Sequence, residues 1–420
     1  MHFEHSERVK QLQRQLTAFM DAHIYPRLQQ YRDEVKAGQY PVSFMADLKA
    51  LAKSEGLWNL FLPGLQDNEP GTRLSNLEYA PLAEIMGRVP WCSEVFNCNA
   101  PDTGNMELLH LFATPEQREQ WLNPLLNGEI RSAFAMTEPD VGSSDATNIQ
   151  TRIARDGDDY IVSGRKWYIS NSAHPHCKLF ILMGKTDPDN PNPHHQQSMV
   201  LIPRDAPGVK ILRNLKVMNH TNPHGHCEIL FDNVRIPASN LLGEEGKGFA
   251  MAQARLGPGR IHHCMRSIGQ AELALQLLIG RAQERKTNGK FLYQHGAVAD
   301  WIARSRIEIE QARLLVLKAA WKIDEVGSKA AADDISLIKA LIPTLHTTVV
   351  DRAIQTFGAM GTSEDLPLAD MWSQGRALRY ADGPDEVHIR KIARMEIKRT
   401  NEKAVDVSHF YFRPEYDEIN

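Results

Sequence analysis

The sequence has no long hydrophobic run, few cysteines and almost no net charge. Its strongest apolar runs, such as residues 179–183, are far shorter than the roughly 20 residues that a membrane-spanning helix needs, and we expect them to be buried strands. The 5 cysteines are odd in number and lack CxxC spacing, which argues against a disulfide framework and a zinc ribbon. The 48 basic and 52 acidic residues give a net charge of −4, so we expect no nucleic-acid partner and no anionic membrane surface.

A targeting segment is also lacking at the start of the chain. The first residues, MHFEHSERVKQLQRQL, contain no apolar core and no cleavage site of the secretory type. Glu4 and Glu7 occur early, which disfavours an organelle transit peptide. We therefore expect a cytoplasmic protein that works in a reducing compartment.

The composition is that of a globular chain with two or three structural units. Of its 420 residues, 42% are hydrophobic and 24% are charged. Residues 1–130 show helical spacing, with Val9, Leu12, Leu16 and Phe19 on one face, and predict an N-terminal α-helical domain. In residues 131–243, strand-length apolar runs alternate with turn residues, which predicts an antiparallel β-barrel or sandwich.

Helical periodicity returns in residues 244–420. We expect amphipathic helices at residues 270–286, 295–326 and 335–357, the last one kinked at Pro343. Their broad apolar stripes predict a four-helix bundle or an oligomer interface. The predicted fold class is therefore α+β, with a helical domain, a middle β-domain and a C-terminal helical bundle.

Two segments near the β-domain are rich in residues that bind ligands. Residues 134–145, FAMTEPDVGSSD, offer hydroxyls and backbone donors that hold a phosphate, or else form an ordinary turn before a strand. Residues 164–171, GRKWYISN, place two aromatic residues side by side on a strand. Successive strand residues face opposite sides, so one ring is expected in the core and the other at a surface or cleft.

A third segment, residues 378–388 (LRYADGPDEVH), gathers three carboxylates around a Gly-Pro turn. Asp385 and Glu386 have a structural explanation, because acidic residues in the first turn stabilise a helix. Asp382 lies before the turn and has no such explanation. It is therefore the strongest candidate for a functional carboxylate.

These three segments, in this order and spacing, resemble the acyl-CoA dehydrogenase family. The resemblance covers about residues 10–400 and is greatest to the branch of family members ten and eleven. Residues 284–287 (ERKT), 355–361 and 379–386 match further family motifs. The resemblance implies an FAD-dependent enzyme, with FAD between the β-domain and the C-terminal helices, that forms a homodimer or homotetramer.

The resemblance also implies the residues that bind FAD. Met136 and Thr137 would contact the pyrimidine side of the flavin, Tyr168 and Ser170 the ring and its N5 edge, and Ser143 the pyrophosphate. Others would serve the FAD of a neighbouring subunit. The complete implied set is Phe134, Met136, Thr137, Ser143, Ser144, Trp167, Tyr168, Ser170, Arg285, Gln355, Pro384, Asp385 and Glu386, with Arg285 and Gln355 acting across the subunit boundary.

The reaction that the resemblance implies is dehydrogenation of an acyl-CoA thioester. Asp382 stands where most members have a glutamate base, and would take the α-proton while hydride leaves Cβ for the flavin. The product would be a trans-2-enoyl-CoA, in fatty-acid or related acid catabolism. Some members carry the base near the position of Gly259, where glycine excludes it here. Arg260 matches an active-site arginine, or else is a surface arginine at a helix start. We also expect burial of the acyl chain to exclude water and so raise the pKa of the base.

The sequence alone leaves alternatives for the substrate and for the electron acceptor. Ser144, Asp102 and Gly383 are expected to contact substrate, and the polar residues 99–105 lie where the family places the acyl tail. They predict a 4-hydroxy- or 4-phospho-acyl chain, or else form a capped turn. Electron-transfer flavoprotein is the expected acceptor. The alternatives are a flavin oxidase or monooxygenase on this fold, and a helical scaffold. The histidines at 174, 176, 220, 224 and 226 lack metal-ligand spacing, so no metal is expected.

Overall fold

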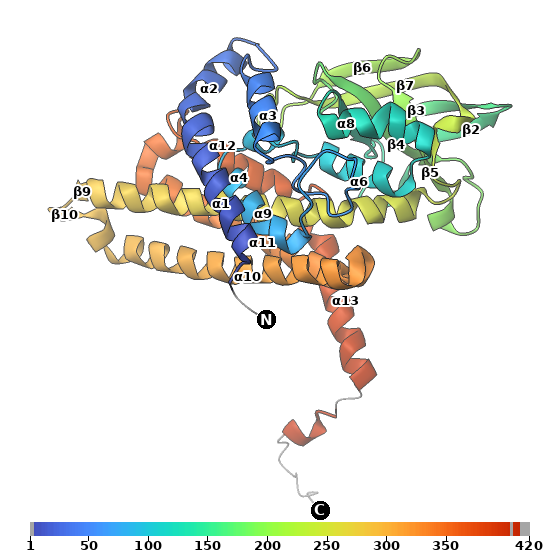
Figure 1. The fold of residues 1–420 in the computed structure, drawn as a ribbon. Coiled ribbons are helices and arrows are strands. Elements are labelled where there is room, and N and C mark those ends of the chain that lie inside the picture. The colour runs from blue at the N-terminus through green and yellow to red at the C-terminus, as the bar shows by residue number, and fades with distance from the viewer. Residues whose placement is uncertain (1–3, 404–405, 412–420) are drawn as a thin grey trace, which may run out of the picture.

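The computed structural model describes residues 4–403 and 406–411. Its first part is helical, as predicted. In Figure 1 these helices lie beside the sheet of the middle part. Serines begin two of these helices: Ser6 accepts from the backbone of Val9, and Ser75 forms a capping box with Glu78. The elements are α1 (Glu7–Phe19), α2 (Leu28–Lys36), α3 (Met45–Ser54), α4 (Asn76–Gly87), α5 (Cys92–Val95), α6 (Asp102–Phe112), α7 (Pro115–Gln117) and α8 (Asn123–Asn127).

The middle part is one eight-stranded sheet with the order β6-β7-β3-β2-β4-β5-β8, in which β1 pairs with β4. The pairs are antiparallel except β1–β4 and the short β2–β4 contact, which are parallel. The parallel strand β1 is not predicted by the alternation of short runs and turns. The strands are β1 (Arg131–Ala135), β2 (Arg152–Asp156), β3 (Asp159–Ser170), β4 (Cys177–Lys185), β5 (Gln197–Pro203), β6 (Val209–Asn214), β7 (His226–Pro237) and β8 (Leu241–Leu242).

Strand β4 joins the sheet to the helical domains because both of its faces are buried. Leu179, Ile181 and Met183 pack into the large core shared with the helices. Phe180 and Leu182 point to the other face and pack into the core of the sheet itself. A strand buried on both sides reads as a continuous apolar run. The run at residues 179–183 is therefore an internal strand, as predicted.

The C-terminal part consists of long helices that run beneath the N-terminal helices and the sheet (Figure 1). They are α9 (Gly248–Glu284), α10 (Gly296–Ala330), α11 (Ala332–Phe357), α12 (Leu368–Leu378) and α13 (Asp385–Lys403). A small hairpin, β9 (Lys286–Thr287) and β10 (Lys290–Phe291), follows α9. Helix α11 continues through Pro343, and the non-helical residue in this region is Gly327 in α10.

Helix α9 begins at Gly248, not near residue 270 as expected, so Arg260 is not at a helix start. Gly257, Pro258 and Gly259 resemble a helix break in sequence but lie inside α9. A Cβ on Gly257 would lie 3.0 Å from that of Ser328, and one on Gly259 would lie 3.8 Å from a carboxylate oxygen of Asp382. Gly257 therefore allows close packing, whereas a Cβ at Gly259 would make an ordinary contact. Tertiary contacts outweigh the low helix propensity of this segment.

Within the described part of the chain, no helix is long and apolar enough to cross a membrane. The five cysteines are all buried free thiols. Among these same residues, no group of three or more histidine, cysteine or acidic side chains has the arrangement of a metal site.

Candidate active site at the junction of the domains

The loop between α12 and α13 holds Asp382 in an unusual backbone conformation. Asp382 has φ of 55° and Gly383 has φ of 106°. Positive φ is uncommon for residues other than glycine and often marks functional sites. The ammonium group of Lys339 holds this loop by donating to the carbonyls of Leu378 (2.7 Å) and Gly383 (3.2 Å). From α9, Arg260 donates through Nε to the carbonyl of Asp382 at 2.9 Å.

The Asp382 carboxylate lies against α9 and remains partly open, with its side chain 20% exposed. Burial alone would raise the pKa of Asp382. The hydrogen bond from His263 and the charges of Arg255 and Arg260 outweigh burial and hold that pKa well below its usual range. The rise in the pKa of the base that is expected when an acyl chain is buried would therefore start from this low value. Arg260 itself, one of the predicted residues, is confirmed as a neighbour of Asp382.

Arg255 is a site residue that the sequence analysis missed. It is 7% exposed, its Nε donates to Asn105 at 3.0 Å, and its guanidinium lies 4.1 Å from the ring centre of Phe134. Its terminal nitrogens donate to no acceptor among the described residues. Arg255 thus brings free donors to the junction of the three domains. Its position on α9 was hidden because that helix was expected to begin after it.

A bulge in β3 turns both aromatic residues of the second segment away from the core. The register shifts between Lys166 and Ile169, which are both buried, and Tyr168 has φ of 52°. Trp167 is half-buried and Tyr168 is exposed, and their ring centres lie 4.9 Å apart. The prediction that one ring lies in the core is therefore wrong, because strict alternation fails at a bulge.

The aromatic strand lies close to the loop of Asp382. The pKa of Tyr380 is raised mainly by burial, and the neighbouring phenol of Tyr168 adds to this increase. Behind the strand, the hydroxyl of Ser170 lies 2.9 Å from Nδ1 of His226, whose pKa is lowered by burial. The β-domain therefore presents the ring of Tyr168 toward the loop that precedes α13.

Buried hydrogen bonds hold the loop after β1 against β3. The ammonium of Lys166 donates to the carbonyl of Met136 at 2.8 Å and to the carboxylate of Glu138 at 2.9 Å. Trp167 donates its backbone N–H to the carbonyl of Thr137 at 3.0 Å, and the Thr137 hydroxyl donates to the carbonyl of Trp167 at 2.5 Å. The hydroxyl oxygen of Thr137 is left to accept from a ligand.

The same loop ends in a run of free backbone donors. The N–H groups of Gly142, Ser143 and Ser144 donate to no acceptor within the described residues. The Ser143 hydroxyl accepts from the backbone of Glu138 at 3.0 Å, which fixes the turn. Consecutive free amides form a concave site for anions such as phosphate. Together with the outward-facing rings, these donors fit a large flat cofactor that carries a pyrophosphate.

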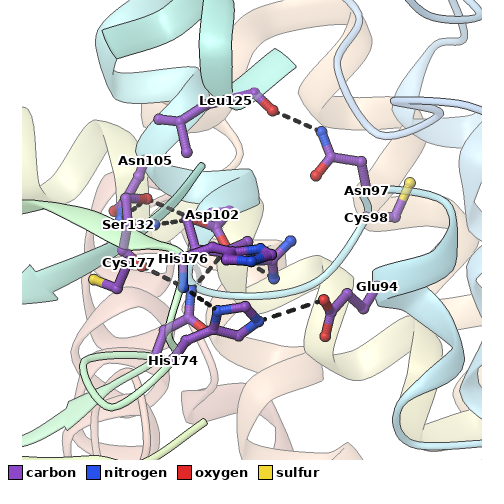
Figure 2. A network of polar contacts seen from close by, with 12 residues as sticks. Glu94, Asn97, Cys98, Asp102, Asn105, Leu125, Ser132, His174, His176 and Cys177 are labelled. Carbon is purple, nitrogen blue, oxygen red and sulfur yellow. Dashed lines mark hydrogen bonds and ion pairs between the residues drawn. The ribbon is translucent and has the colours of Figure 1, made fainter. Parts of the chain in front are cut away.

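Asp102, expected to contact the acyl tail, is instead fully engaged inside the protein (Figure 2). Its Oδ1 accepts from the backbone and the hydroxyl of Ser132, both at 2.6 Å. Its Oδ2 accepts from Asn171 at 2.9 Å and pairs with Arg131 at 2.9 Å, with both charged side chains 1% exposed. No lone pair remains for substrate, so Asp102 is a structural residue that joins the N-terminal domain to the sheet.

This network continues through further buried polar residues. Glu94 pairs with Lys49 at 2.7 Å and lies 3.7 Å from His174. Asn97 donates to the carbonyl of Leu125 at 2.9 Å, as Figure 2 shows. Within the polar segment 99–105 that suggested a substrate pocket, Asp102 and Asn105 thus both hydrogen-bond to Ser132 of β1.

The remaining predicted residues divide between the loop and the surface. Asp385 begins α13 as expected, and its carboxylate accepts from Arg379 at 2.6 Å. Pro384 is half-buried and Glu386 is exposed in the first turn of α13. Arg285 and Gln355 are exposed as well. Arg285 follows the end of α9, and the 25 residues from Arg260 (285 − 260) span roughly 38 Å of helix.

The structure thus brings a carboxylate loop and a cationic helix face together, with the aromatic ring of Tyr168 near Tyr380 of that loop. A site of this composition, between a sheet and a helical bundle, belongs to the class of cofactor-dependent oxidoreductases. Models of the N-terminal, middle and C-terminal domains of acyl-CoA dehydrogenases match residues 6–129, 133–234 and 246–396. The chain belongs to the acyl-CoA dehydrogenase family, which confirms the resemblance and the predicted fold.

Two curated relatives show how much of a protein this chain represents. FadE2 of Mycobacterium tuberculosis is 53% identical over 408 residues, which cover 95% of this chain and 98% of FadE2. Acyl-CoA dehydrogenase family member 11 of Homo sapiens is 50% identical over 388 residues, covering 90% of this chain but 49% of that protein. The chain therefore spans about half the length of the human relative.

Solved structures have the same architecture. An acyl-CoA dehydrogenase-type protein from Mycobacterium abscessus has a TM-score of 0.90 and 47% identity, covering 94% of this chain and 100% of that chain. Butyryl-CoA dehydrogenase of Megasphaera elsdenii has a TM-score of 0.80 and 25% identity over 94% of this chain and 100% of its own. PigA, solved with FAD and proline, has a TM-score of 0.83 at 24% identity over 95% and 100%, a likeness of fold alone.

Proposed function

We propose that this protein is an FAD-dependent acyl-CoA dehydrogenase in which Asp382 removes the α-proton of the thioester. The observation that carries this proposal is the partly open Asp382 carboxylate, fixed through its backbone by α9 and α11 and close to the aromatic strand. Bound FAD would accept the hydride from Cβ, which yields a trans-2-enoyl-CoA.

Three groups of residues support FAD as the cofactor. The free amides of Gly142, Ser143 and Ser144 would bind the pyrophosphate. The exposed ring of Tyr168 and the half-buried ring of Trp167 would contact the flavin ring. Ser170, backed by His226, would contact the flavin edge. We keep Phe134, Met136 and Thr137, which lie on or beside the loop after β1, in the same proposed set.

Asp382 offers both groups that proton abstraction needs. Its backbone N–H donates to no acceptor within the described residues, so it is free to bind the thioester carbonyl and stabilise the enolate. Its carboxylate would take the α-proton of the same molecule. Substrate binding would displace water from the open side of this carboxylate and raise its low pKa toward a useful value. The base would thus gain strength once the substrate is present.

The shorter aspartate is accommodated by the approach of its loop to α9. Arg260 holds the backbone of Asp382 against this helix, and the carboxylate lies beside Gly259. An aspartate is one methylene shorter than the usual glutamate, and proton transfer requires a heavy-atom distance of about 3.2 Å or less. The pinned backbone would supply part of the missing reach. Ser144 and Gly383 remain proposed substrate contacts.

The location of Arg285 and Gln355 supports oligomerisation. Both are exposed and Arg285 is far along α9 from Asp382, so they would serve the FAD of a second copy. Exposed apolar residues at seven-residue spacing follow one side of α10: Ile307 (57%), Leu314 (50%) and Trp321 (41%). Such a stripe is typical of a helix that packs against a partner. Light scattering on the wild type and Leu314→Glu would test this proposal.

A second candidate, an acyl chain with a hydroxyl or phosphate at C4, is favoured by unpartnered polar atoms near α9. The amide oxygen of Asn99, the hydroxyl of Tyr79 and both ring nitrogens of His262 are buried without a hydrogen-bond partner. A hydrocarbon tail would leave them unpaired, which is unfavourable in a protein interior. Asn99 takes the place that Asp102 was expected to fill.

The physiological acceptor and the compartment are part of the proposal. Electron-transfer flavoprotein would receive the electrons in the dehydrogenase form of the reaction, whereas an oxidase or monooxygenase would consume oxygen. Reoxidation of the reduced protein in the presence and absence of air separates these alternatives. The five free thiols are compatible with a reducing, cytoplasmic environment.

The decisive experiment is an anaerobic titration of the purified protein with plain and 4-substituted acyl-CoAs. We expect a bound flavin whose oxidised band bleaches with one substrate class. Asp382→Asn should retain the flavin but lose the bleaching. Bleaching that survives in Asp382→Asn would overturn the assignment of the base, and absence of flavin would overturn the proposal. Equal bleaching by plain and substituted substrates would reject the polar acyl chain.

A further inference from the structure

His263 contacts the carboxylate of Asp382 and is not used in the proposed reaction so far. Its Nε2 lies 3.3 Å from Oδ2 of Asp382. Its Nδ1 lies 3.3 Å from Nη2 of Arg266, and Nη1 of the same arginine is 3.4 Å from the carbonyl of Cys98. The three side chains form a row that runs from the N-terminal domain to the carboxylate.

The direction of the hydrogen bonds follows from the chemistry of arginine. A guanidinium only donates, so Nδ1 of His263 must accept from Arg266. A neutral imidazole carries its proton on the other nitrogen, which places Nε2–H toward the oxygen of Asp382. Burial lowers the pKa of His263, so the ring is neutral near pH 7. His263 therefore donates a hydrogen bond to Asp382 without adding a full charge.

We propose that His263 is the positioning residue of the base: it binds Oδ2 of Asp382 and leaves Oδ1 to take the substrate proton. This inference rests on the proposed function. Other contacts named above hold the backbone of Asp382, whereas His263 holds its carboxylate. Gly259 has no side chain to support that carboxylate from the helix. Without His263, the side chain of Asp382 would be free to rotate.

A neutral donor suits this position because the site already contains cations. Arg255 and Arg260 act on Asp382 from α9, and Lys339 acts from α11. His388 of α13 lies beside Gly383, but burial lowers its pKa to about 4 and leaves it neutral. The thiol of Cys264 also faces this carboxylate. A further full charge would stabilise the carboxylate and weaken it as a base. A neutral imidazole orients Asp382 at a smaller loss of basicity.

The tautomer can be observed without turnover. In protein labelled with ¹⁵N-histidine, His263 should show the neutral Nε2–H form at pH 7, assigned by comparison with His263→Gln. In Asp382→Asn this form should persist, because Arg266 still donates to Nδ1. An Nδ1–H tautomer, or a protonated ring at pH 7, would overturn the proposal.

Anaerobic flavin reduction across pH then separates positioning from packing. His263→Ala should slow reduction by about 10- to 100-fold with little change in substrate affinity. It should also move the acid limb of the pH profile up by about one unit, because Asp382 loses a donor. His263→Gln, whose amide can donate, should recover part of the rate. The matched control is His346→Gln, another buried histidine, which should leave the acid limb in place.

The outcomes distinguish a failure of the positioning role of His263 from a failure of the proposed function. If Asp382→Asn is inactive while His263→Ala keeps the wild-type rate and pH profile, the positioning role is wrong and the proposed function stands. If Asp382→Asn still reduces its flavin, the proposed function itself fails.

Discussion

Two aspartates at the domain junction show what decides whether a carboxylate is structural or chemical. Asp102 and Asp382 both lie in polar segments with prolines and glycines, and both approach buried arginines. The side chain of Asp102 is 1% exposed and both of its oxygens are engaged. That of Asp382 is 20% exposed, and one oxygen contacts His263. One carboxylate holds domains together, and the other keeps an open side for a ligand.

The difference arises from the backbone around each residue. Asp102 begins α6, next to strand β1, whose backbone and side chains supply donors on every side. Asp382 lies in a tight loop with positive φ, where hydrogen bonds hold the carbonyl and leave the N–H free. Polar composition alone does not separate these two environments.

Removal of the open carboxylate should have the largest effect of the tests that follow. Asp382→Asn should slow flavin reduction by about 10²- to 10⁴-fold, the usual contribution of a general base. Its free energy of unfolding should change less than that of an Asp102 variant, because the side chain is not enclosed. Stopped-flow reduction and urea denaturation on the same samples measure both quantities. If Asp382→Asn were stable and reduced its flavin at the wild-type rate, Asp382 would not be the chemical carboxylate of the two.

Removal of the enclosed carboxylate should act on stability. Asp102→Ala leaves Arg131 buried without its partner and should lower the free energy of unfolding by about 3–5 kcal/mol. The control is Asp300→Ala, which breaks an exposed pair with Arg304 and should change the free energy of unfolding little, because solvent screens exposed charges. If Asp102→Ala were as stable as the wild type but bound acyl-CoA poorly, Asp102 would be a substrate ligand after all.

The enclosed region should also make the protein sensitive to acid. Burial lowers the pKa of His224 to about 3, so the folded protein holds this ring neutral. The unfolded chain protonates it below about 6.5, and stability is therefore full above that pH and falls as pH decreases toward 3. The slope from this group is about 1.4 kcal/mol per pH unit. Urea denaturation from pH 7 to 4.5 should show a shallower decline in His224→Gln, and an equal decline would reject this origin.

The opposite pH dependence is expected for Glu107, a buried carboxyl in α6. Burial raises the pKa of Glu107 to about 8, so it is mostly protonated at pH 7. Its stabilising contribution is present below about 4.5 and is lost as pH rises through 8. Glu107→Gln resembles the neutral acid and does not ionise, so its free energy of unfolding should rise above that of the wild type between pH 4.5 and 8, by about 1.4 kcal/mol per pH unit. It should be more stable than the wild type at pH 9; a clear loss there would show that the ionised form is required.

Much of the fold could be predicted because hydrophobic periodicity reports the local structure directly. The N-terminal helices, the run at residues 179–183 and the long C-terminal helices follow from spacing alone. The errors have local causes. Gly257, Pro258 and Gly259 resemble a helix break but pack inside α9, and the bulge at Trp167 and Tyr168 interrupts the alternation of β3.

The site could be predicted in part. Asp382 and Arg260 were identified through the motifs that contain them, and the structure places them in contact. Arg255 and the role of His263 could not be identified, because their significance depends on the loop of residues 379–383, which is distant in the chain and lies against α9 in space. Asp102 was misassigned because a polar segment gives no information about where its partners lie.

The sequence by itself determined the order of the three domains, the class of fold and the identity of the candidate base. These properties follow from short-range patterns in the sequence, namely the spacing of apolar residues, the turn residues and a few motifs. Only the tertiary structure decided which carboxylate is enclosed, which stays open, and which histidine and arginines surround it. The physical reason is that hydrogen-bond partners, burial and therefore pKa depend on contacts between segments far apart in the chain, which local pattern does not specify.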